Sequence, residues 1–228
     1  MFTRRLAFLS LLLLSFACLA AGPSGRLDLL AGVHDGGTAR SDKPGDKQEN
    51  RQVFVGGLQD GAKLRTLFSI DLSAIPDGAH IQSAVLTLTI HSKDRNTSSA
   101  VGEATVELHE LAETPSHYVT WQGPDSKRTW DSPGGDFAEP VLADADVSPA
   151  QANDGQQLTF EGEALLSLVQ QSRQKDEPLL NLAVISPQLE SQGEEGRRGV
   201  LRLHGPNGKF APMLTVRYQL PDASAEPH

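Results

Sequence analysis

The sequence predicts an all-β protein, an antiparallel β-sandwich of the jelly-roll type with one short helix. Two observations predict this fold. About seven or eight short segments carry the alternating apolar and polar residues of half-buried strands, and Gly- or Pro-rich turns separate them. The 228 residues include 21 Gly and 14 Pro, and the hydrophobic fraction of 38% can supply a substantial core. That fraction excludes wholesale disorder.

The N-terminus has the three-part pattern of an export signal. Arg4 and Arg5 provide a positive start, residues 6–19 are almost entirely apolar, and small residues follow. We therefore expect residues 1–20 to be a signal peptide and the protein to be secreted or to reside in the periplasm or cell envelope. The alternative is a lipoprotein signal in which Cys18 carries a lipid anchor. No later apolar run has the ~20 residues that a transmembrane helix needs.

Charge and cysteine content exclude several classes of protein. The formal net charge of −9 argues against a nucleic-acid partner, which requires a basic face. Cys18 is the only cysteine, so neither a disulfide framework nor a Cys-rich metal centre is available. Because no repeat or linker divides the chain, we expect one domain. Its predicted boundaries are a short segment over 21–26, the domain over 27–220 and a frayed tail over 221–228.

The strands follow from the alternation of apolar residues. Residues 32–50, rich in Gly, Asp, Ser and Lys, predict a loop before the strand expected over 53–55. Phe68, Ile70 and Leu72 fall on one face of a strand, and Leu86, Leu88 and Ile90 do the same further along. Strands are expected over 53–55, 64–72, 83–91, 104–111, 158–160, 179–185, 199–204 and 213–220.

The helix and the longest irregular segment complete the prediction. Leu165, Leu168 and Val169 have helical spacing and predict a helix over 163–174. Residues 193–198 predict a solvated hairpin turn. Residues 112–157 form a long segment rich in Pro, Gly and Asp, which predicts a functional or disordered loop. Because this segment contains both tryptophans, we expect it to be ordered.

Five stretches, in one order along the chain, resemble the motifs of DNRLRE-domain proteins. They are R-T-L-F-S-I-D-L-S-A-I-P over 65–76, G-A-H-I-Q-S-A-V-L over 78–86, Y-V-T-W over 118–121, W-D-S-P-G-G-D-F over 130–137 and A-P-M-L-T-V-R-Y over 211–218. The resemblance covers residues 30–220 and implies an extracellular β-jelly-roll related to alginate-type carbohydrate-binding modules and to the modules beside methanogen disaggregatases. The chain departs from the family where Leu203-His204-Gly205 replaces the usual Ser-Arg-Glu.

Aromatic side chains in the long segment are the candidates for sugar binding. A flat ring buries the C–H face of a pyranose, so Trp130, Trp121 and Tyr118 could stack on sugar rings. Lys127 and Arg128 could pair with the carboxylate of a uronate. For both tryptophans the alternative is that the ring packs in the core.

Acidic residues in the same segment suggest a structural calcium ion, although no cofactor is required. Calcium takes six to eight oxygen ligands, and Asp136 is the preferred candidate because Gly134 and Gly135 allow close backbone approach. The alternative is that these acids cap solvated turns.

We therefore expect a secreted, non-catalytic module that binds an extracellular or cell-envelope polysaccharide. A uronate-rich polysaccharide and stabilisation by calcium are the finer expectations. One alternative is a structural or adhesive surface protein that binds no sugar. The other is a polysaccharide lyase. A lyase could use His117 and Tyr118, but adjacent strand residues point to opposite faces. The chain also lacks the common hydrolase and metalloprotease motifs.

Overall fold

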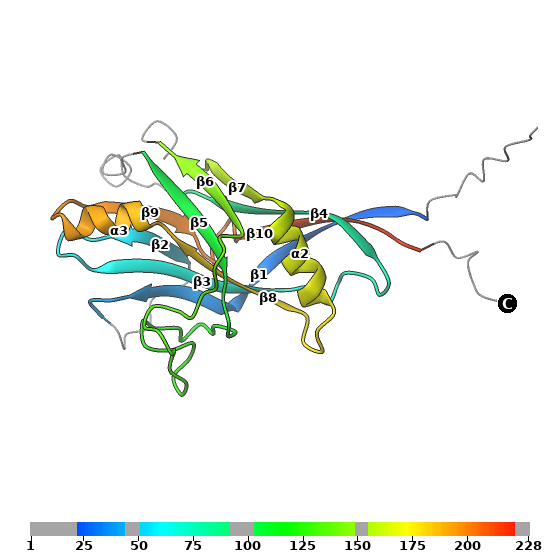
Figure 1. Cartoon of the computed structure of the whole chain (residues 1–228), viewed down its shortest axis with the longest axis horizontal. Helices are drawn as coiled ribbons and strands as arrows, with labels where there is room; N and C mark the ends of the chain where they lie inside the picture. Colours follow the sequence, from blue (N-terminus) through cyan, green and yellow to red (C-terminus); the bar gives the residue numbers. More distant parts are fainter. Residues whose placement is uncertain (1–21, 44–50, 92–102, 149–154, 222–228) are drawn as a thin grey trace, which may run out of the picture.

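The alternating segments form strands that pair antiparallel throughout, as predicted (Figure 1). The structure is a computed structural model, and it describes residues 22–43, 51–91, 103–148 and 155–221. In chain order the elements are β1 (Ser24–Arg40), β2 (Gln52–Gly57), β3 (Lys63–Asp71), β4 (His80–Thr89), β5 (Ala104–Glu110), β6 (Ala143–Val147), β7 (Gln157–Glu161), α2 (Glu163–Arg173), β8 (Leu179–Ile185), α3 (Pro187–Glu194), β9 (Gly199–His204) and β10 (Met213–Gln219).

The strands form two layers that share β1. In the first sheet, the start of β1 pairs with β10, which pairs with β4, which pairs with β7. In the second sheet, the end of β1 pairs with β3, followed by β8, β5 and β6, and the β2–β9 pair joins at β3. The register of β1 shifts between Ala31 and Gly36, where the strand passes from one sheet to the other.

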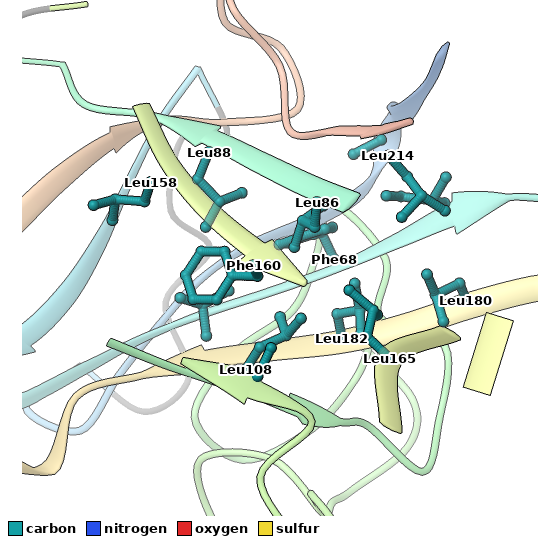
Figure 2. Close-up of a cluster of buried hydrophobic side chains, with 14 of the residues drawn as sticks. Phe68, Leu86, Leu88, Leu108, Leu158, Phe160, Leu165, Leu180, Leu182 and Leu214 are labelled. Carbon is teal, nitrogen blue, oxygen red and sulfur yellow. The ribbon is translucent and has the colours of Figure 1, made fainter. Parts of the chain in front are cut away.

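The main core lies between the two sheets. Phe68 from β3, Leu86 from β4, Leu108 from β5 and Phe160 from β7 are fully buried there (Figure 2). Leu182 from β8 joins them. The predicted alternation is confirmed, because inward residues of each strand meet those of the opposite sheet and burial of this apolar surface drives folding.

The predicted helix is confirmed as α2, which spans Glu163–Arg173. Leu165, Leu168 and Val169 are buried, and the helix packs against β4 of the first sheet and β8 of the second (Figure 1). At its end, the Arg173 guanidinium donates two hydrogen bonds, of 2.9 and 2.8 Å, to the carbonyl oxygen of Ile75. These bonds attach the helix to the loop between β3 and β4.

A second helix contradicts the prediction of a single one. Ser186 caps α3 by accepting a hydrogen bond from the Leu189 amide, and Pro187 occupies the first turn, where no amide hydrogen is needed. The predicted turn over 193–198 therefore begins too early. Gly193 is buried in the helix, where a Cβ atom would lie 2.6 Å from the Leu58 carbonyl oxygen.

Two further predictions were wrong at irregular segments. Residues 32–40 belong to β1, although they were expected to be loop. Only glycine fits at position 36, because a Cβ atom there would lie 2.3 Å from the Leu67 carbonyl oxygen. Residues 143–147 form β6 inside the expected long loop. Its two aspartates have low strand propensity, but Asp146 accepts a 2.9 Å hydrogen bond from Thr105 on β5.

The expectations for the two ends of the chain fall mostly on residues that the structure does not describe. The expected signal peptide over 1–20, including Cys18, lies outside the described residues, and so does the tail over 222–228. Strand β1 begins at Ser24, three residues before the expected start of the domain. Among the described residues, neither helix has the length and apolar character that crossing a membrane requires.

Candidate functional site

The long segment after β5 is an ordered layer on the outer face of the second sheet. Leu67 and Ala183 point away from the main core, and Val119 and Trp130 of the segment cover them in a second buried cluster. Figure 1 shows this segment as the green coil beneath β1 and β3. The expectation of order is confirmed over the described residues 112–148, because this part of the segment buries apolar residues of its own.

Trp130 lies in this second cluster and is 5% exposed. Its indole Nε1–H donates a 3.1 Å hydrogen bond to the carbonyl oxygen of Thr120. A ring enclosed in this way has no free face for a sugar. The structure therefore corrects the assignment of Trp130 to ligand binding and supports the core-packing alternative.

Trp121 is half-buried, and its ring contacts a cation of the protein itself. The Arg65 guanidinium carbon lies 4.9 Å from the centre of the Trp121 ring and 5.1 Å from the centre of the Phe137 ring. The same guanidinium donates hydrogen bonds of 2.9 and 3.2 Å to the two carboxylate oxygens of Glu190, which is buried. Trp121 thus encloses an internal ion pair and presents only part of its surface to solvent.

Tyr118 is the one predicted aromatic residue that is well exposed, at 46%. Its ring centre lies 3.8 Å from that of His117. The two residues lie in a turn and their rings touch, so the expectation that they point to opposite faces was wrong.

The cations expected near these aromatics differ in availability. Arg128 donates to the carboxylates of Asp125 at 2.6 Å and Glu113 at 2.8 Å, and to the Thr114 carbonyl oxygen at 3.2 Å. Because these partners occupy the guanidinium, Arg128 is a poor ligand for a uronate. Lys127 is exposed. The hydrogen bond from the Lys127 amide, together with those from Arg128, lowers the pKa of Asp125 to about 2.

Asp136 holds the turn that precedes it. Its two carboxylate oxygens accept hydrogen bonds from the backbone amides of Asp131 at 2.8 Å and Ser132 at 2.6 Å. This arrangement is the turn-capping alternative. Within the described ranges, no group of three or more His, Cys, Asp or Glu side chains is placed to hold a metal ion. Calcium binding at Asp136 stays a prediction.

A groove that the sequence analysis did not identify lies on the outer face of the first sheet. It has a volume of about 570 Å³ and is formed by β1, β4, the start of β7, the 206–211 loop and the start of β10. Its apolar lining includes Leu30, Phe210 and Met213. Hydrogen-bonding side chains complete the lining: Thr87, Thr89, Gln157, Asn207 and Lys209.

Strand alternation and a tight turn place the two large apolar side chains in this groove. Leu29 is buried in the core, so its neighbour Leu30 points outward and is 58% exposed. Phe210 is 46% exposed, and its ring meets that of His204 edge-on with centres 5.1 Å apart. Leu30, Phe210 and Tyr118 are the exposed large hydrophobic residues of the described chain. Two of these three therefore meet at one concave surface.

Three histidines of the described chain are buried outside the lining of the groove, although His204 contacts Phe210. His91 and His204 are buried, with ring centres 4.5 Å apart, and His109 is buried beside Glu107. In the lining of the groove, Lys209 is the only charged side chain. The described groove therefore suits binding, because it presents no acid–base pair; the absence of enzymatic activity stays a prediction.

Comparison with known proteins does not assign a family. No protein-family model and no curated protein matches the chain. The resemblance to DNRLRE-domain proteins therefore stays an interpretation of the five motifs. Two of them have structural roles here, since Arg65 forms the internal ion pair and Trp130 lies in the second cluster.

Proposed function

We propose that this chain is a non-catalytic module that binds an extracellular or cell-envelope polysaccharide in the groove on the first sheet. The observation that carries the proposal is the pairing of exposed Phe210 and Leu30 in one open groove bordered by polar side chains. Exposed large apolar residues that gather in one concavity are characteristic of binding sites.

The chemistry of the groove matches that of a sugar chain. The ring of Phe210 can bury the C–H face of a pyranose, and Leu30 and Met213 extend the apolar floor. The amides of Asn207 and Gln157 can each donate to and accept from sugar hydroxyls. The volume of about 570 Å³ lies within the ~300–1,000 Å³ range of small-molecule sites.

The sequence adds support for location and ligand class. The export pattern over 1–20 would place the module outside the cytoplasm, where polysaccharides are its available partners. The DNRLRE resemblance points independently to carbohydrate binding.

Glycan-array screening followed by calorimetry on the preferred oligosaccharide tests the proposal. We expect Phe210→Ala to weaken binding about tenfold, which corresponds to ~1.4 kcal/mol. Tyr118→Ala is the matched control, because Tyr118 has the same exposed fraction but lies in the segment on the second sheet. Undiminished binding by Phe210→Ala would overturn the assignment, and loss of binding by Tyr118→Ala would move the site to that segment.

The same exposed residues favour one second function, a structural or adhesive protein that assembles through this face. Sedimentation measurements distinguish the two functions. Self-association of the wild type that Phe210→Ala abolishes, with no glycan bound, would support assembly. Release of unsaturated sugars, followed by ultraviolet absorbance, would instead identify a lyase.

A further inference from the structure

The charges on the outer face of the first sheet balance one another. Among the described residues of this face, three side chains are cationic and three are carboxylates: Arg26, Lys209 and Arg217 against Asp28, Asp35 and Glu161. The chain as a whole has a formal net charge of −9. An anionic polymer would therefore approach against a repulsive long-range field, and this face has no net positive charge to offset that field.

Two of the three cations already have a partner in the protein. The Arg26 guanidinium donates to the Asp28 carboxylate at 3.0 Å, and the Lys209 ammonium lies 4.9 Å from the centre of the Phe210 ring. Arg217 lies on β10, outside the lining of the groove. The described lining therefore offers a ligand carboxylate only one cation, and that cation already contacts an aromatic ring.

A carboxylate stands at the edge of the groove. Leu30 points outward from β1, so Gly32, two residues further on, has the same orientation and lies in the lining. A Cβ atom at Gly32 would lie 1.8 Å from Oδ2 of Asp35. The Asp35 carboxylate therefore occupies the outward side of Gly32. It can accept a hydrogen bond from a sugar hydroxyl there, and it repels a negative charge.

The strand register places apolar and hydroxyl side chains in one row across the first sheet. Leu30 of β1 is opposite Met213 of β10, and Met213 is opposite Thr87 of β4. Thr87 is in turn opposite Thr159 of β7. Opposite residues in antiparallel strands point to the same face. Because neighbouring strands lie about 4.8 Å apart, the row is roughly 14 Å long. It is apolar at its β1 end and carries hydroxyl groups at its β7 end.

This row matches a sugar ring whose substituents are all equatorial. In a β-linked glucan, the two faces of each ring present C–H groups, and the hydroxyl groups project from the ring edges. The C–H faces suit Leu30, Met213 and the Phe210 ring. The hydroxyl groups suit threonines, which donate and accept and whose side chains are stiff. An axial hydroxyl, as in a mannan, would interrupt one face.

We propose that the polysaccharide bound in the groove is uncharged, has the equatorial ring substituents of a β-linked glucan, and lies across the strands. This inference rests on the proposed function and specifies the ligand of the same site. The C–H faces of the sugar contact Phe210 and the apolar end of the row, and its hydroxyl groups bond to the threonines. Asp35 accepts a hydroxyl hydrogen bond at the edge of the groove, and its charge disfavours anionic chains.

Two cellulose derivatives test the charge by calorimetry. Hydroxyethyl cellulose and carboxymethyl cellulose share one glucan backbone, but only the second is charged. We expect the wild type to bind the uncharged polymer about fivefold more tightly at low salt, the upper range for an exposed charge interaction, and the difference to shrink as salt is raised. Asp35→Asn, which keeps the shape of the side chain beside Gly32, should bring the two affinities closer. Asp144→Asn is the control, because Asp144 is an exposed aspartate on β6 of the second sheet.

Two oligosaccharides test the shape of the ring. Cellohexaose and mannohexaose differ in whether one hydroxyl group of each ring is equatorial or axial. We expect cellohexaose to bind about fivefold more tightly, because a stacked ring face contributes on the order of 1 kcal/mol.

The outcomes separate this inference from the proposed function. A preference for the uncharged polymer and for cellohexaose, with the charge preference reduced in Asp35→Asn but not in Asp144→Asn, supports the inference. Equal or tighter binding of carboxymethyl cellulose, equal or tighter binding of mannohexaose, or an unchanged preference in Asp35→Asn overturns it. Binding confined to other glycans on the array also overturns it and leaves polysaccharide binding intact. A folded wild type that binds neither these ligands nor any glycan on the array overturns both proposals.

Discussion

The ion pair between Arg65 and Glu190 provides the sharpest test of how the second sheet is held together. Arg65 lies on β3 and Glu190 lies in the first turn of α3, so the pair connects elements 125 residues apart. The side chains are 14% and 8% exposed, and the hydrogen bonds of 2.9 and 3.2 Å engage both carboxylate oxygens. Trp121 and Phe137 enclose the guanidinium.

Removal of one partner leaves the other charge largely buried and without its bidentate partner. Glu190→Met should therefore cost about 3 kcal/mol of unfolding free energy, the lower end for a broken buried pair, because Arg65 loses its anionic partner and the neighbouring Lys63, which also contacts Glu190, is itself a cation. For a chain of this size, that cost corresponds to a decrease in melting temperature of roughly 6–12 °C. The double variant Arg65→Met/Glu190→Met removes both charges and should be less destabilised than the sum of the single variants by about 2 kcal/mol.

Urea unfolding followed by circular dichroism measures all three variants. Glu195→Met is the control, since Glu195 pairs with Arg197 on the surface and both side chains are more than half exposed. We expect this control to cost less than ~1 kcal/mol. Additive costs in the double variant, or a cost for Glu190→Met as small as that for Glu195→Met, would refute the reasoning that burial makes this pair important.

Two further predictions concern the segment over 112–142. Trp130→Ala should destabilise the protein by about 3–5 kcal/mol, because it leaves a cavity in the second cluster. The glycan affinity of the folded variant should be unchanged. A stable variant that has lost its glycan affinity would show instead that Trp130 belongs to the binding site. Asp125→Asn should lower the urea midpoint at pH 7, because the folded pKa of Asp125, about 2, is below its unfolded value of ~3.9. Its contribution is present above about pH 4 and is lost as pH falls toward 2, so the difference from wild type should disappear over that range; a difference independent of pH would contradict this assignment.

The fold was predictable wherever burial alone decides the local structure. β8 and β9 begin and end at the predicted residues, because their apolar residues follow a regular pattern between clear turns. Prediction failed where the deciding contact is distant in sequence. Gly36 looks like a loop residue until β3 is placed against it, and α3 is recognisable mainly from its Ser186 cap, which also donates to the Thr105 carbonyl oxygen.

The candidate site was harder to predict because exposure is a property of the assembled sheets. Tryptophans in a Gly- and Pro-rich segment are reasonable candidates for sugar binding. In this segment, however, Trp130 packs against the second sheet and holds the segment in place. Leu30 and Phe210 lie 180 residues apart, and neither stands out, since Leu30 belongs to an apolar pair and Phe210 to a short loop. One signal was available: Leu29 and Leu30 cannot both face the core of a strand that has one buried side.

The difference between the outer faces of the two sheets explains why function should be sought on the first sheet. The outer face of the second sheet is covered by residues of the long segment, and Arg65 of β3 is paired internally with Glu190 of α3. The outer face of the first sheet has no such cover in the described chain along the groove, where Leu30 and Phe210 remain exposed. Exposed apolar side chains oppose solubility unless a ligand or partner uses them. The face whose contacts are incomplete is therefore the one on which a bound polysaccharide would complete them.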